Sequence, residues 1–259
     1  SDMLDNIDPA NHWMTDASTA FLGAEKDYIG SSIFKTDAQF QLALTTWVGD
    51  SYAADLSYGN ITTWNTALVT DMSNAFNHEA GAYQAYALVD GSQNLRYFNE
   101  DITGWDTGNV TSMASMLKAT SFNHNISSWN VSKVTDMYQA LSGQNSINTP
   151  VFNQDISSWN VTKVTSMSLM FDGLPNFNQN IGSWNTAKVT NLSYTFRYCT
   201  NFNQDLNLWN VSKVADMDRM FIRSSFNQDI SGWNVSKVNN MTKMFMSSSF
   251  NQDLRHFAW

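Results

Sequence analysis

One sequence motif recurs along most of this chain and restricts what it can fold into. Clear copies are FNHNISSWNVSKVTDM from Phe122, FNQDISSWNVTKVTSM from Phe152 and FNQDLNLWNVSKVADM from Phe202. The tryptophans at the same motif position are separated by 41, 24, 30, 25, 25 and 24 residues, at Trp64, Trp105, Trp129, Trp159, Trp184, Trp209 and Trp233. A motif that returns at a nearly fixed period indicates a stack of similar units, each covering the open face of its neighbour.

The apolar residues of each unit fall in columns with irregular spacing. Ile or Leu follows the Phe after four residues, Trp follows after three more, Val after five and Met after three. Neither a helix nor a strand gives this spacing over a whole unit, whereas a closed coil can point such residues inward from several walls. We predict a repeat solenoid, right-handed and leucine-rich-repeat-like, with about eight coils of 24–25 residues, short parallel strands as at 156–159 and short helical turns as at 167–171.

The motif is absent from the N-terminal part of the chain. We assign residues 1–57 to an N-terminal segment with a capping helix and residues 58–259 to the repeats. The helix is expected over residues 36–48, where TDAQFQLALTTWV opens with a Thr/Asp cap signal and places Phe40 and Leu44 on one face. An open end of a stacked array needs such a lid.

Two insertions interrupt the period, near residues 77–97 and 142–150. Loops added to a repeat array project from one face and often carry binding residues. The C-terminal end is a second candidate surface, because a coil without a neighbour leaves apolar side chains uncovered. The candidate partner-binding residues are therefore His78, Glu79, Tyr83, Tyr86, Tyr97 and Trp259.

Polar residues also recur in columns. One Asn follows the Phe of each unit, and a second Asn follows the Trp, except where Asp106 replaces it. Stacked Asn side chains can bond to one another and to turn backbone, although a ligand-binding role is the alternative. A Lys also recurs, at Lys133, Lys163, Lys188, Lys213 and Lys237. Either Asp136, Asp216 and a recurring Asp column neutralise this Lys column, or the Lys column is a basic strip that binds an anionic polymer or protein.

Composition argues against several functions. A net charge of −9 disfavours nucleic-acid binding, and no apolar run approaches the length of a membrane span. With one cysteine, Cys199, and four scattered histidines, the sequence predicts no metal site and no cofactor. The Asp column that includes Asp205 and Asp229 recurs with the motif, so we interpret it as serving each coil rather than catalysis, and we expect no enzyme activity.

The consensus FNQDISSWNVSKVTDMxxMF resembles the short repeat of BspA-like leucine-rich-repeat surface proteins, found in mycoplasmas, other bacteria and marine algae. The segment from FQLALTTWVGD through YGNITTWNTALVTDM is similar to the lead-in that often precedes those repeats. The resemblance covers about residues 36–257. It implies an extracytoplasmic, non-enzymatic protein, at a cell surface, secreted or in an organelle lumen, that acts in adhesion or protein contact.

We therefore expect a protein–protein interaction scaffold, either a surface adhesion protein or an extrinsic subunit of a larger assembly, with a protein partner. The alternative is a carbohydrate-binding module that uses exposed aromatic residues of the 77–97 insertion. Exposed rather than buried Trp rings would favour the carbohydrate alternative.

Overall fold

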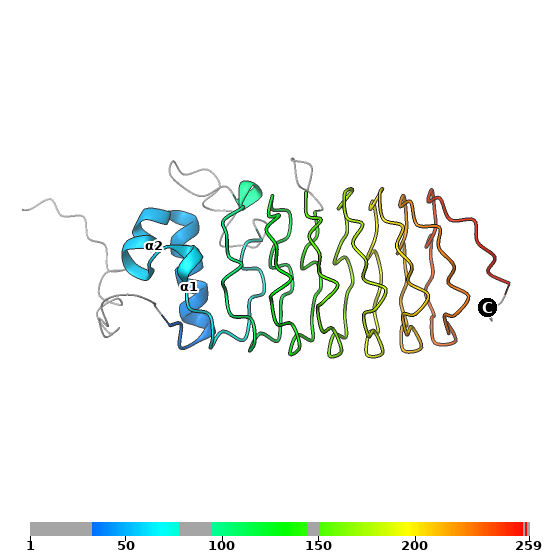
Figure 1. The fold of residues 1–259 in the computed structure, drawn as a ribbon, viewed down its shortest axis with the longest axis horizontal. Helices are drawn as coiled ribbons and strands as arrows, with labels where there is room; N and C mark the ends of the chain where they lie inside the picture. Colours follow the sequence, from blue (N-terminus) through cyan, green and yellow to red (C-terminus); the bar gives the residue numbers. More distant parts are fainter. Residues whose placement is uncertain (1–32, 78–94, 144–150, 256, 258–259) are drawn as a thin grey trace, which may run out of the picture. The chain divides into compact units, whose positions relative to one another are not determined.

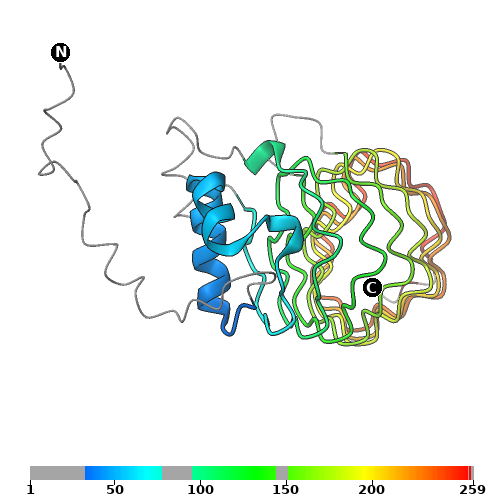
Figure 2. The same cartoon turned by 60° about the vertical axis from the view of Figure 1, so that its left-hand side comes forward.

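The described residues of the computed structural model are 33–77, 95–143, 151–255 and 257. The chain divides into two compact units, Ser1–Gly30 and Ser31–Trp259, and all described residues belong to the second. Within this unit, successive repeats lie side by side in a row, and the two helices stand beside the first repeat (Figure 1). In a view turned toward the long axis of the row, the backbones of successive repeats overlap in similar closed outlines (Figure 2).

Helix α1 spans Asp37–Gly49 and helix α2 spans Ser51–Tyr58. The Thr36 hydroxyl accepts the N–H of the residue three positions on, which caps α1 at its N-terminus. Asp50 ends α1 and its carboxylate caps α2. The helix expected over residues 36–48 is therefore present as α1.

Helix α1 packs on the first repeats through one apolar face and one carboxylate. Phe40 is fully buried, and its ring lies edge-on to Trp105 with 5.5 Å between the ring centroids. The carboxylate of Asp37 accepts the backbone N–H and the hydroxyl of Thr70, both at 2.7 Å. Gln41 donates to the Ser73 carbonyl at 3.4 Å. Helix α1 thus covers apolar side chains of the first repeats and pairs with a backbone donor at Thr70 and a backbone acceptor at Ser73.

The predicted leucine-rich-repeat-like solenoid, with short parallel strands and short helical turns, is wrong. Besides α1 and α2, the described residues contain only two 3-10 helices, η3 (Ile61–Thr63) and η4 (Leu95–Tyr97), and no strand. The parallel β-bridges between neighbouring repeats, such as Ser166 with Asn191, are isolated and do not extend into strands. The segment 156–159, expected as a strand, is a turn in which the Trp159 N–H donates to the Ile156 carbonyl at 3.1 Å.

The segment expected as a short helix, residues 167–171, is a run of overlapping turns. In residues 169–174 the backbone N–H groups alternate between two kinds of acceptor. Those of Met170, Asp172 and Leu174 donate three residues back, and those between them donate to the next repeat, as Leu169 does to the Ser193 carbonyl at 3.0 Å. Leu169 has φ of 59°, outside both helix and strand. We call this side of each repeat the turn wall; it consists of residues 72–77, 113–120, 137–143, 167–174, 192–199, 217–224 and 241–248.

Left-handed residues recur in register along the turn wall, and most are not glycine. They form a first column of Asn74, Ser115, Gln139, Leu169, Tyr194, Arg219 and Lys243, and a second column of Ala119, Gly173, Tyr198, Arg223 and Ser247. A positive φ is unfavourable for residues with a Cβ. In the turn wall, the positive φ directs the backbone N–H of the residue toward the following repeat. The hydrogen bonds formed there offset the conformational cost of the positive φ.

The opposite sides of the repeats are joined by two other hydrogen-bonded columns. The Oδ1 atom of each Asn that follows the Phe accepts the backbone N–H of the equivalent Asn in the next repeat; Asn178 and Asn203, for example, are linked in this way at 3.0 Å. In a second column the Thr190 N–H donates to the Thr165 carbonyl at 2.8 Å. The Asn after the Trp instead caps its own turn, as Asn160 does for the N–H of Thr162.

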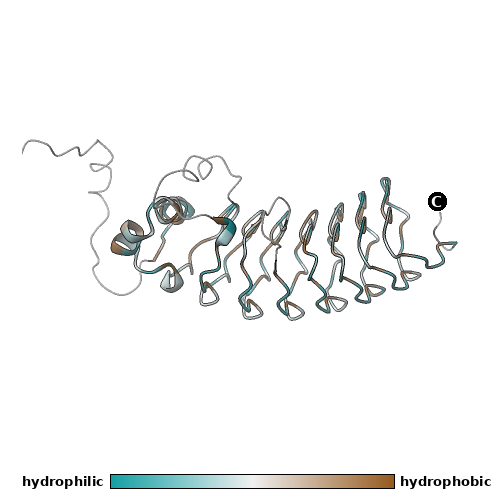
Figure 3. Cartoon of the chain, turned by 90° about the horizontal axis from the view of Figure 1, so that it is seen from above, coloured by the Kyte–Doolittle hydropathy of each residue, from teal (hydrophilic) through white to brown (hydrophobic). Residues whose placement is uncertain are grey.

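The core lies between these walls and consists of aromatic columns. Every repeat alternates hydrophobic and hydrophilic segments (Figure 3). The rings of Trp159, Trp184 and Trp209 stack with centroids 6.4 Å apart, and those of Phe171, Phe196 and Phe221 with centroids 5.5 Å apart. The expected burial of the repeat tryptophans is confirmed, since Trp184 is only 3% exposed. Its indole N–H also donates to the Ile156 carbonyl of the preceding repeat.

We predict that Trp184→Ala lowers the free energy of unfolding by about 3–5 kcal/mol, because it removes a buried ring stacked on both sides. Chemical denaturation followed by circular dichroism measures the loss. Leu208→Ala is the matched control, since Leu208 is 82% exposed in the neighbouring repeat and should change stability by about 0.5 kcal/mol or less. Equal costs for the two substitutions would contradict this packing.

A second prediction concerns the last described repeat, residues 241–250. Phe245 and Phe250 are partly exposed, whereas the equivalent Phe221 and Phe226 are fully buried. Four backbone N–H groups of residues 217–223 donate to carbonyls of residues 240–246. Within the described residues, the equivalent N–H groups of 241–247 donate to no following repeat. Hydrogen exchange measured by mass spectrometry should therefore be faster in residues 241–250 than in 167–196. Equal protection would contradict the expectation.

Candidate interaction surface

Most of the residues predicted to bind a partner lie outside the described residues: His78, Glu79, Tyr83, Tyr86 and Trp259. Tyr97 is described at the end of η4, and it is 64% exposed. Its ring is thus accessible, and it is the one predicted partner-binding residue within the described part of the chain.

The structure shows a different cluster, which the sequence did not indicate. Two tyrosines and three arginines lie close together on the turn wall; we call them the Arg–Tyr patch, and they are Tyr194, Arg197, Tyr198, Arg219 and Arg223. Tyr194 and Arg219 share the first left-handed column, and Tyr198 and Arg223 share the second. The unusual backbone of the wall therefore sets the places from which these side chains extend.

Arg197 is fixed at the centre of the patch by a buried carboxylate. Its Nε and Nη2 atoms donate to the two oxygens of Asp172 at 2.7 and 2.6 Å, which is a bidentate ion pair. Burial raises the pKa of Asp172, against the lowering effect of the Arg197 hydrogen bonds. Those same hydrogen bonds raise the pKa of Arg197, so the guanidinium stays charged. Removing Arg197 would leave the buried Asp172 carboxylate without its bidentate partner.

The guanidinium groups and the phenol rings alternate across the patch. The Arg197 guanidinium carbon lies 4.8 Å from the Tyr194 ring centroid and 5.3 Å from that of Tyr198. Arg219 lies 5.5 Å from the Tyr194 ring, and Arg223 lies 5.5 Å from the Tyr198 ring. Cation–π contacts of this kind hold side chains that would otherwise be flexible. The patch is therefore preorganised before any partner arrives.

Two ends of the patch differ in charge. Arg219 donates to the Tyr194 hydroxyl at 2.7 Å and to the Asp218 carboxylate at 2.6 Å, so its charge is balanced. Arg223 is exposed, and among the described residues its guanidinium contacts only the Tyr198 ring. Tyr198 is 38% exposed. The outer end of the patch thus offers one aromatic ring and one positive charge without a carboxylate partner.

The chemistry of the described residues gives little support to other kinds of site. No group of three His, Cys, Asp or Glu side chains that could hold a metal ion occurs in this part of the chain. Cys199 is buried, burial raises the pKa of its thiol, and its Sγ donates to the Phe171 carbonyl. A thiol in this state is not an activated nucleophile.

The recurring Asp column has a local role in each turn. Asp155 accepts the N–H of Ser157 at 2.9 Å, and Asp205 accepts the N–H of Asn207 at 2.8 Å. The hydrogen bonds from Ser157 lower the pKa of Asp155. These carboxylates therefore cap turns.

The Arg–Tyr patch was missed because its residues occupy the motif positions that vary from repeat to repeat. A signal was nonetheless present: Tyr194 and Tyr198 stand 25 residues before Arg219 and Arg223, at the same two motif positions. Comparing variable positions between adjacent repeats would have paired each tyrosine with an arginine.

Comparison with known proteins gives one match. No curated protein and no solved structure matches the chain. No helix among the described residues is long and apolar enough to cross a membrane. A family model described as "Mycoplasma protein of unknown function, DUF285" matches residues 30–152 and again residues 144–257. Because the two matches together cover most of the sequence, the chain belongs to this repeat family of unknown function.

Proposed function

We propose that this protein is a non-enzymatic protein–protein interaction scaffold, either a surface adhesion protein or an extrinsic subunit of a larger assembly. The observation that supports this most is the Arg–Tyr patch. Tyr and Arg are enriched at the residues that dominate binding energy in protein interfaces. Held in alternation, they lose little side-chain entropy when a partner binds.

The charge of the patch favours a partner segment with a carboxylate. Arg223 lacks an acidic partner among the described residues, and Tyr198 beside it offers an apolar face and a hydroxyl. A protein surface that places an Asp or Glu beside an apolar side chain would satisfy both.

The finer assignment to BspA-like surface proteins and an extracytoplasmic location belong to the same proposal. The resemblance of the FNQDISSWNVSKVTDM units to that family supports both. An adhesion protein and an assembly subunit use the patch in the same way, because each presents it on a regular backbone to another protein.

The carbohydrate-binding alternative receives less support from the described residues. Sugar recognition by stacking needs exposed aromatic rings, and the repeat tryptophans are 2–5% exposed. Of the aromatic residues predicted for that role, Tyr97 is the one described, and it is exposed.

We predict that replacing the outer end of the patch, in the double variant Tyr198→Ser and Arg223→Ser, weakens partner binding about tenfold or more. The partner would first be identified as a stoichiometric component that co-purifies with the native protein, and its affinity then measured by calorimetry. Tyr52→Ser with Leu208→Ser is the control, since both residues are exposed and lie outside the patch.

Full affinity in the patch variant would show that the contact lies elsewhere. If shortening the 77–97 insertion removed binding while the patch variant kept it, the insertion would be the interface. Absence of any stoichiometric partner would contradict the scaffold function itself.

A further inference from the structure

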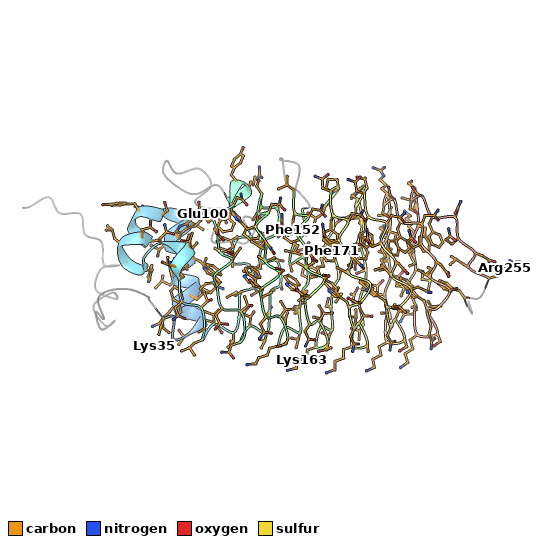
Figure 4. All side chains as sticks on the ribbon, in the orientation of Figure 1. Lys35, Glu100, Phe152, Lys163, Phe171 and Arg255 are labelled. Carbon is orange, nitrogen blue, oxygen red and sulfur yellow. The ribbon has the colours of Figure 1, made fainter. Side chains whose placement is uncertain are left out.

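The Lys column of the repeats is exposed in every member. These residues occupy one motif position in five consecutive repeats, and Lys163 extends from the lower edge of the stack, whereas Phe152 and Phe171 lie within it (Figure 4). The five are Lys133, Lys163, Lys188, Lys213 and Lys237. Two residues after each lysine, a backbone N–H donates to the preceding repeat, as that of Thr190 does to the Thr165 carbonyl. Successive lysines are therefore separated by the distance between neighbouring repeats.

None of the five ammonium groups is paired with a carboxylate within the described part of the chain. The Asp136 and Asp216 carboxylates, which could have neutralised the column, instead accept the backbone N–H groups two residues further on, at 2.9 and 2.8 Å. Lys133 donates to the amide oxygen of Asn109 at 2.5 Å. The column is therefore a row of uncompensated positive charges on a protein whose net charge is −9.

The groups on either side of the Lys column are neutral and polar. The Asn after each Trp is exposed in these repeats, as at Asn160, Asn185 and Asn210. On the other side, the hydroxyls of Thr165 and Thr190 donate to the preceding repeat at 3.0 and 3.1 Å. Amides and hydroxyl oxygens can hydrogen-bond to neutral hydroxyl groups between the charges of a ligand.

We infer that the Lys column binds a linear acidic polysaccharide, with successive lysines pairing with successive carboxylate or sulfate groups. A row of identical cations at a regular interval matches a polymer that repeats one anionic unit. The flanking Asn amides suit the sugar hydroxyls. This site is separate from the Arg–Tyr patch and does not depend on the proposed protein contact.

Two other polyanions fit the column less well. Single-stranded nucleic acid needs exposed rings on which bases stack, and the Trp rings of these repeats are buried. The negative net charge also opposes the close approach of a densely charged phosphate backbone. An anionic membrane would favour apolar side chains interleaved with the lysines, whereas the flanking columns are amides and hydroxyls.

The test measures binding of oligogalacturonates of increasing length to the full chain in calcium-free buffer at low salt. We expect affinity to rise with length until the oligomer can reach all five lysines, and to fall as salt is added. The triple variant Lys163→Gln, Lys188→Gln and Lys213→Gln should raise Kd about tenfold or more while the thermal melting curve stays unchanged. The same oligomer with its carboxylates methyl-esterified should not bind.

The matched control is Lys35→Gln, Lys243→Gln and Arg255→Gln, which removes the same charge at exposed positions outside the column. It should leave Kd within about twofold of the wild type. The inference is overturned if the control weakens binding equally, if the methyl ester binds as well, or if nothing binds. It is also overturned if single-stranded DNA of equal charge binds as tightly through the same three lysines.

Discussion

The hydrogen bonds that run from the turn wall of one repeat to the next are what the rest of this structure depends on. In residues 169–174 the N–H groups alternate, one donating to the following repeat and the next closing a turn within its own repeat. The backbone N–H groups of these six residues are thus paired without a strand or a helix. The positive φ angles of the non-glycine residues are unfavourable, and the hydrogen bonds to the following repeat offset that cost.

This backbone pattern also links the fold to the proposed contact. Tyr194 and Arg219 share one left-handed column, while Tyr198 and Arg223 share the other, so the repeat spacing sets the cation–π distances. The ion pair between Arg197 and Asp172 then holds the centre of the cluster. A single repeat could not form the patch, because its five residues come from two consecutive repeats and the Asp172 carboxylate that holds Arg197 comes from a third.

Much of the packing could be predicted from the sequence, but the backbone could not. The period identified the stacked units, the Trp column predicted buried rings, and the cap signal at Thr36 predicted α1. Ile156–Trp159 was predicted as a strand because a column of apolar residues fits either a strand or a turn. Positive φ at tyrosine and arginine has no sequence signal, since these residues rarely adopt it. The Arg–Tyr patch was missed for a different reason, because its residues occupy motif positions that vary from repeat to repeat.

The central claim is that overlapping turns with left-handed residues, rather than strands, join the repeats. The most direct measurement is the set of backbone φ angles in solution, obtained from NMR chemical shifts and scalar couplings at Tyr194, Tyr198, Arg219 and Arg223. The account predicts positive values at all four, near the 59°, 61°, 51° and 54° of the structure. Extended values, with φ well below zero at these residues, would contradict it and would restore a strand-based wall.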